Sequence, residues 1–294
     1  MEDKFSVFNE GKIKAEKLTK IGIGVLIFAV ILFIILSSTI SQDATMVLSF
    51  IVGIVGFIFI GIGSVKFRKL SKSFKYDVLV KLFEESLPGT VYNPDAGLSQ
   101  MDVYGTEFIK TADRFYTEDL ITGSIENVDF ISSDVRLEER HVEQTKNGTR
   151  VYYVPYFIGR IFKFNFNKEF EGYLQVLESG SPISKHKFEK VKLESIDFNK
   201  KFKTYATTEL SAFYVLTPDI IEAIMHLEKA NPGRIGLSFT GETLYIAINN
   251  NKDTFELKMF KPIDNSIIEE FKKDLLVIKD VIVALKLNNN LFKK

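Results

Sequence analysis

Three acidic residues gather around one arginine near the middle of the chain. Asp113, Glu118 and Asp119 are close in sequence, with Arg114 among them. Neighbouring carboxylates can act as a general acid and base, or provide the oxygen ligands of a hard cation. Acidic residues in a loop beside a turn give the same pattern without any chemistry, and we favour that interpretation. The cluster is nevertheless the first candidate site.

A histidine alternates with two acids further along the chain. His141 lies between Glu139 and Glu143, a spacing that directs all three side chains to one face of a strand and would suit a metal ion. A solvent-exposed strand face produces the same alternation, and we favour that explanation. The other histidines, His186 and His226, are distant in sequence, one in a Lys-rich loop and one on a predicted helix.

The sequence lacks the signatures of several enzyme classes. It has no Cys, which excludes thiol nucleophiles, disulfides and Cys-ligated metals. It also has no P-loop, no dinucleotide-binding glycine motif, no H-E-x-x-H and no G-x-S-x-G. We therefore assign no catalytic residue and expect neither a cofactor nor a metal. Enzymatic activity is uncertain and less favoured than a binding role.

The amino-terminal region contains two long uncharged segments. Residues 21–40 and 44–65 carry no charged side chain. At a rise of about 1.5 Å per residue, each reaches across the hydrocarbon core of a bilayer. Both therefore predict transmembrane helices, joined by the three-residue turn Ser41, Gln42 and Asp43. A pair of buried core helices is the alternative, but such helices would leave no polar face for water.

Basic residues flank this hairpin on the side away from its turn. Before the first span they are Lys12, Lys14, Lys17 and Lys20; after the second, a membrane-surface collar comprises Lys66, Arg68, Lys69, Lys72 and Lys75. The positive-inside rule then places both termini in the cytoplasm. The collar would also attract anionic lipid headgroups, although it can equally serve topology alone.

The balanced net charge of the chain conceals two regions of opposite sign. From Tyr76 onward there are 28 basic and 33 acidic residues, so the soluble portion is acidic while its membrane flank is basic. An acidic domain argues against nucleic-acid binding, which depends on neutralising phosphates. We expect partners among lipids and proteins, in an oligomeric state that the sequence leaves open.

The remaining pattern predicts an α+β fold: a transmembrane helical hairpin followed by a soluble, mainly antiparallel β domain with a mid-domain helix and a C-terminal helix. The predicted regions are a basic flank (1–20), the hairpin (21–65), a juxtamembrane amphipathic helix (66–90) and the cytoplasmic domain (91–294). Strands are predicted near 125–142, 150–166, 172–178, 191–193, 202–207, 234–239, 243–248 and 255–260, and helices near 217–229 and 267–287. The Asn147-Gly148 pair favours a hairpin turn between the first two strands.

Several segments together resemble a bacterial domain-of-unknown-function family. They are FYTEDL (115–120), GSI (123–125), the run 162–172, FNKKFKTY (198–205), YVLTP (214–218), LSF (237–239) and LYIAI (244–248). Members of this family are two-pass membrane proteins with a cytoplasmic carboxyl-terminal domain, and the resemblance implies the same arrangement here. The family pattern has an Arg before the YVLTP tyrosine, where this chain has Phe213. The resemblance brings no catalytic residues.

These observations favour a bacterial inner-membrane protein that serves as a membrane-tethered binding or scaffolding module. The alternative is a membrane-anchored hydrolase or metal-dependent enzyme that uses Asp113, Glu118, Asp119 or His141. A transporter or channel is disfavoured, because the two apolar segments contain no ionisable residue.

Overall fold

The computed structural model describes residues 2–37, 41–146 and 148–288 of the chain. It divides into two compact units. The first comprises Met1–Leu79 and Glu256–Glu270, and the second comprises Val80–Phe255 and Phe271–Lys294.

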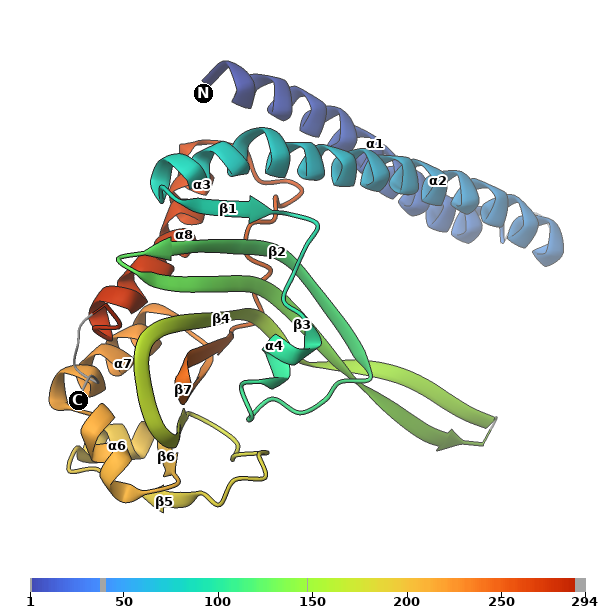
Figure 1. The fold of residues 1–294 in the computed structure, drawn as a ribbon. Coiled ribbons are helices and arrows are strands. Elements are labelled where there is room, and N and C mark those ends of the chain that lie inside the picture. Colours follow the sequence, from blue (N-terminus) through green and yellow to red (C-terminus); the bar gives the residue numbers. More distant parts are fainter. Residues whose placement is uncertain (1, 38–40, 147, 289–294) are drawn as a thin grey trace. The chain divides into compact units, whose positions relative to one another are not determined.

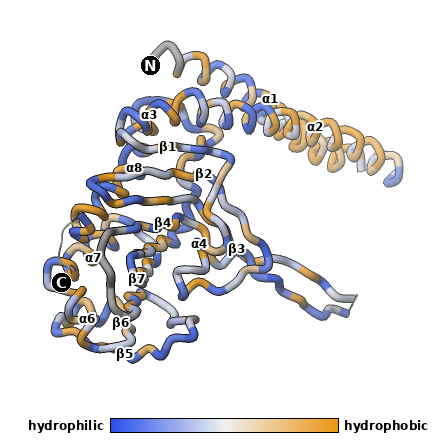
Figure 2. The backbone as a smooth tube through the Cα atoms, in the orientation of Figure 1, coloured by the Kyte–Doolittle hydropathy of each residue, from blue (hydrophilic) through white to orange (hydrophobic). Residues whose placement is uncertain are grey.

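Two long helices form most of the first unit (Figure 1). Helix α1 spans Glu2–Leu36 and α2 spans Gln42–Phe74. Both are long and apolar enough to cross a membrane, and Figure 2 shows apolar residues filling the half of each helix nearer their connection. The predicted turn is wrong in part, because α2 already includes Gln42 and Asp43. Residues 38–40 of the first predicted span lie outside the described residues.

The two helices approach closely at glycines. A Cβ atom on Gly22 would lie 2.6 Å from the carbonyl oxygen of Gly56, and one on Gly63 would lie 2.8 Å from the carbonyl oxygen of Ala15. A side chain at either position would therefore push the helices apart. Gly24 has open space at the corresponding point. Only some of the glycines in the predicted spans are thus needed for hairpin packing.

An irregular segment, residues 256–264, packs on the polar ends of these helices. The side-chain amide of Asn9 donates to the carbonyl oxygen of Ile263 at 2.7 Å and accepts from its backbone N–H at 3.0 Å. The carboxylate of Glu16 accepts from the backbone N–H of Phe260 at 2.9 Å. These contacts satisfy backbone groups outside regular structure, and they set a polar boundary to the apolar hairpin.

The second unit is built on one antiparallel sheet. Its strands are β1 (Thr90–Asn93), β2 (Arg114–Ile125), β3 (Val128–Thr145), β4 (Gly148–Leu177), β5 (Glu189–Val191), β6 (Lys203–Ala206) and β7 (Arg234–Asn249). The strand order is β1-β2-β3-β4-β6-β5, and β7 also pairs with β4. The α+β class with two apolar amino-terminal helices is confirmed. The hairpin of β3 and β4 is confirmed as well, although Asn147 of its predicted turn lies outside the described residues.

Several strand predictions require correction. Residues 150–166 and 172–177 are both part of β4, and the predicted hairpin around residues 240–242 is the single strand β7. These two strands pair along most of their length, so each continues through a bend where the sequence suggested a turn. Strand β2 was missed because its charged residues resemble a loop, whereas residues 255–260 form no strand.

Helices complete the fold around the sheet. Short helices are α3 (Val80–Ser86), which follows the π-helical turn η1 (Lys75–Leu79), α4 (Gln100–Tyr104), α5 (Ile196–Lys201) and α6 (Glu209–Val215). The mid-domain helix is α7 (Pro218–Ala230) and the C-terminal helix is α8 (Asn265–Ala284). Pro218 opens α7, and the Thr217 side chain before it makes no capping hydrogen bond.

Both faces of the sheet carry apolar contacts. On one face, Val103 of α4 packs with Val135, Leu137 and Ile161. On the other, the ring of Phe255 lies 4.7 Å from that of Phe83 and 5.8 Å from that of Phe271. The sheet is therefore a central layer with covered faces, typical of α+β domains.

The glycine packing of the first unit predicts a position-specific effect. Gly22→Ala should destabilise the helical hairpin by about 1–3 kcal/mol, because the new methyl group meets backbone atoms of α2. Gly24→Ala, two residues away in open space, is the matched control and should leave stability unchanged or raised. Thermal unfolding of the full chain in detergent measures both. Equal effects at the two positions would contradict the packing.

Candidate functional site

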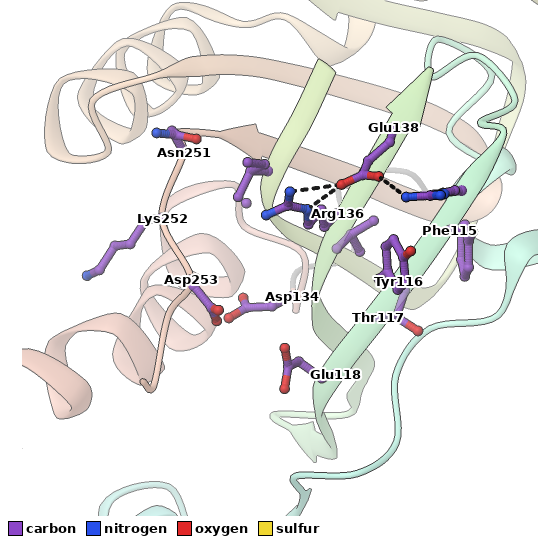
Figure 3. A pocket seen from close by; sticks show the side chains of 14 residues that line it. Phe115, Tyr116, Thr117, Glu118, Asp134, Arg136, Glu138, Asn251, Lys252 and Asp253 are labelled. Carbon is purple, nitrogen blue, oxygen red and sulfur yellow. Dashed lines mark hydrogen bonds and ion pairs between the residues drawn. The ribbon is translucent and has the colours of Figure 1, made fainter. Parts of the chain in front are cut away.

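The second unit contains an open groove of about 990 Å³ (Figure 3). Its lining comes from β2 (Arg114 to Glu118), β3 (Asp134, Val135, Arg136 and Glu138), β4 (Ile158 and Gly159) and the loop 251–253. Strand alternation explains the polar lining. Arg114, Tyr116 and Glu118 stand opposite Glu138, Arg136 and Asp134 in the register, so all six side chains project from one face.

Charged pairs occupy one end of the groove. The Nε of Arg136 donates to Glu138 at 2.8 Å, and Arg114 lies 3.6 Å from the other oxygen of the same carboxylate. The guanidinium of Arg114 also stacks 3.4 Å from the ring centre of Tyr153. About half of each arginine side chain is exposed. An incoming ligand can therefore reach these guanidinium groups, whereas the side chain of their shared partner Glu138 is only 9% exposed.

The loop 251–253 forms the facing wall. The backbone N–H of Asn251 donates to the carbonyl oxygen of Ile158 at 2.9 Å, and the ammonium group of Lys252 pairs with Asp274 at 2.6 Å. Asn251 adopts a positive φ of 55°, which Asn tolerates better than most residues. The wall is thus fixed at both of its ends, by a strand and by α8.

Three carboxylates converge beside the groove, and Asp134 and Asp253 line it. One oxygen each from Asp119, Asp134 and Asp253 lies within 4.8 Å of the others, and Figure 3 shows Asp134 and Asp253 pointing toward one another. Asp119 is fully buried at a bulge of β2 with a positive φ of 58°. Its carboxylate accepts a hydrogen bond from the hydroxyl of Tyr92. By ligand type, these oxygens suit a hard divalent cation.

A buried arginine lies against this cluster. Arg160 is only 5% exposed, and its Nη1 lies 3.7 Å from Asp134. Its Nε donates to Ser132 at 2.8 Å, and its Nη2 donates to the carbonyl oxygen of Asp119 at 2.7 Å. The guanidinium also lies 4.5 Å from the ring centre of Phe255. Arg160 therefore supplies a positive charge to the cluster from within the protein.

Asp134 ties the groove wall to the sheet. Its two carboxylate oxygens accept from the backbone N–H and the hydroxyl of Thr254 at 2.7 and 2.9 Å. Burial, together with the negative charge of Asp119, raises the pKa of Asp134 to about 6, against the lowering effect of Arg160. Burial of this carboxylate costs desolvation free energy, and its hydrogen bonds to Thr254 hold the loop in place.

The predicted site residues divide into two groups. A carboxylate oxygen of Asp119 lies within 4.8 Å of those of Asp134 and Asp253, which line the groove together with Glu118. Asp113 instead accepts from the backbone N–H of Arg140, and His141 stacks on Tyr152, 5.5 Å between ring centres. His141 is seven residues along β3 from Asp134, roughly 23 Å at the usual strand rise, so the structure does not join it to the cluster.

Sequence reasoning missed Asp134, Arg160 and Asp253. A signal was present for two of them. Arg160 interrupts the largely apolar run 151–162 of β4, and Asp134 lies among Ile131, Val135 and Leu137 of β3. Charged residues in such positions are rarely buried unless they are paired. Asp253 gave no such signal, because it is an exposed loop residue.

The basic collar is only partly available to a membrane surface. Lys66, Arg68, Lys69 and Lys72 are exposed on α2. Lys75 is buried and forms an ion pair with Glu256. Lys75 therefore helps to fix the segment 256–264 within the first unit.

Comparison with known proteins bears on the carboxyl-terminal part of the chain. Residues 156–287 match a family model described as protein of unknown function, DUF3137. The expected resemblance to a domain-of-unknown-function family is confirmed over this segment. No curated protein matches the chain.

A solved structure shows a distant likeness. The crystal structure of the mycobacterial trehalose monomycolate transport factor A, TtfA, aligns with 71% of this chain and 96% of its own at 7% sequence identity and a TM-score of 0.38. We draw nothing on function from a likeness of this degree.

Burial of Asp134 predicts a pH-dependent contribution to stability. Between about pH 4, where an unfolded Asp loses its proton, and about pH 6, the folded Asp134 keeps its proton. The stability that this side chain contributes is therefore fully present at low pH and is lost as the pH rises through this window. The unfolding free energy of the wild type relative to Asp134→Asn should fall between these pH values. Thermal denaturation across pH measures it, and a flat difference would contradict the buried position.

Proposed function

We propose that this protein is a membrane-anchored binding or scaffolding module at the cytoplasmic face of a bacterial inner membrane. In this proposal α1 and α2 span the bilayer as a hairpin, both termini lie in the cytoplasm, and the sheet domain presents its groove to a partner. The observation that carries the binding role is the open groove, lined by charged residues of both signs from two strands and a loop.

Three features of the first unit support the anchor. The apolar parts of α1 and α2 are long enough to cross a bilayer. Their polar ends carry the segment 256–264, whose hydrogen-bonded contacts with Asn9 and Glu16 suit an aqueous boundary. Exposed basic residues follow on α2, whereas the connection between the helices contains none.

The charges that line the groove favour a polar partner with both positive and negative groups. Arg114, Arg136 and Lys252 contribute positive charge, and Glu118 and Glu138 contribute negative charge. A polypeptide segment with mixed charges can form ion pairs with the exposed groups among them. Such complementarity favours specificity and rate of association.

The enzyme alternative would use the carboxylates of Asp119, Asp134 and Asp253. Their contacts favour a structural role: Asp134 holds Thr254 with both oxygens, and Asp119 accepts from Tyr92. Arg160 balances part of their charge. We therefore place binding before catalysis for this groove.

Cysteine labelling tests the proposed topology, since the natural chain has no Cys. Ser41→Cys, at the exposed residue just before α2, should react with a membrane-impermeant maleimide in intact bacterial spheroplasts. Lys203→Cys, exposed on β6, should react only after permeabilisation. Replacing Lys66, Arg68, Lys69 and Lys72 with Gln should reduce the fraction oriented this way. The reverse labelling pattern would overturn the proposal.

A photo-crosslinking side chain tests occupation of the groove. Tyr116 lines the groove and is 50% exposed, so a benzoylphenylalanine placed there in living cells should capture a partner. The adduct should decrease at least severalfold when Arg136 and Glu138 are both changed to Ala. Leu210, which is 80% exposed on α6, is the control position. Absence of an adduct at Tyr116, or an adduct indifferent to those substitutions, counts against the groove.

A further inference from the structure

Strands β3 and β4 continue beyond the rest of the sheet as a two-stranded arm. Toward the arm, the pairing of β3 with β2 ends at Glu138, opposite Arg114. The pairing of β4 with β7 ends at Gly159 on the same side. Beyond these points, the described residues of the two strands pair only with each other, and Figure 1 shows them projecting past the sheet. An isolated two-stranded ribbon is marginally stable in water.

The arm is exposed yet contains apolar residues. Val142 is 49% exposed, its cross-strand partner Val151 is 44% exposed, and Tyr152 is 38% exposed. Free strand edges with apolar side chains are ready to pair with another strand. The arm therefore has the properties of an interaction element.

The outer edge of β3 is better suited to pair with another strand than the outer edge of β4. The N–H of Asp113 donates to the carbonyl oxygen of Glu138, and the N–H of Arg140 donates to the carboxylate of Asp113. Because strand residues alternate, the peptide groups of Val142 and Gln144 also face outward on this side. On β4, by contrast, Pro155 lacks an N–H and blunts the edge.

Charge distinguishes the registers centred on His141, Val142 and Glu143. A two-fold axis at Val142 sets Val142 opposite its equivalent and His141 opposite Glu143 of the second copy; it also sets Gln144 opposite Arg140, whose N–H already donates to Asp113. An axis at His141 would instead set Glu139 opposite Glu143. An axis at Glu143 would set that acid opposite itself. Like charges directly opposite are destabilising, so only the Val142 register is free of them among these three.

We propose that a second copy of this chain pairs with the outer edge of β3, antiparallel, about a two-fold axis at Val142. The paired residues are few, so the contact is weak between molecules free in solution. Confinement to one membrane would raise the effective concentration and strengthen it. That strengthening rests on the proposed anchor, whereas the pairing itself depends on neither the anchor nor the groove.

A single cysteine tests this register in the full chain, which has no natural Cys. Opposed residues in a hydrogen-bonded antiparallel pair have Cα atoms about 5.5 Å apart, within reach of a disulfide. Val142→Cys should therefore give a disulfide-linked dimer on mild oxidation in membranes. Val151→Cys is the matched control, similarly exposed but on the inner strand, roughly 14 Å from its equivalent at three strand spacings. It should stay largely monomeric.

Two outcomes would overturn the proposal: equal crosslinking at both positions, or no dimer with Val142→Cys. A second pair of variants guards against a misfolded arm. Val142→Asp would place two acids opposite each other and should lower the dimer fraction, measured by amine crosslinking in membranes, at least fivefold. Val151→Asp should leave that fraction unchanged. Dependence on residue 151 instead of 142 would assign the contact to a different edge or partner.

Discussion

The buried ion pair between Asp134 and Arg160 is the contact on which the groove depends. The two residues are opposite each other in the register of β3 and β4, so the sheet itself brings them together. Asp134 then holds Thr254, and Arg160 holds the backbone of Asp119. A loop distant in sequence is thereby fixed on one sheet face, next to the bulge of β2 within the sheet. The groove between them follows from this arrangement.

The cost of this arrangement explains its form. A buried carboxylate next to a second one is unfavourable unless it is paired and hydrogen-bonded. Here Arg160 pairs with Asp134, Thr254 donates a hydrogen bond to Asp134, and Tyr92 donates one to Asp119. Each of these partners comes from a different part of the second unit. Removing Arg160 would leave Asp134 without the positive charge beside it, and removing Thr254 or Tyr92 would leave a buried carboxylate with fewer hydrogen bonds. Such sites make a rigid frame, which suits a surface that recognises a partner by shape and charge.

Sequence reasoning succeeded where a signal is local. The two uncharged segments predicted long apolar helices because apolarity over twenty residues needs no tertiary context, and Asn147-Gly148 predicted the hairpin of β3 and β4 from turn geometry. It failed where the pairing of strands determines how far each strand extends. The continuity of β4 and of β7 arises from their mutual register, which no single strand reveals. Asp119 was chosen correctly, but Asp134, Arg160 and Asp253 join it only through the sheet and the loop.

The central claim is that the groove is occupied by a partner when the protein is in its own membrane. Hydrogen–deuterium exchange of the backbone amides at Asn251–Asp253, in native membrane vesicles and in the purified protein, tests it most directly. The account predicts slower exchange of this loop in the vesicles, with β5 at the far edge of the sheet unchanged as an internal reference. Identical exchange of the loop in both preparations would contradict it.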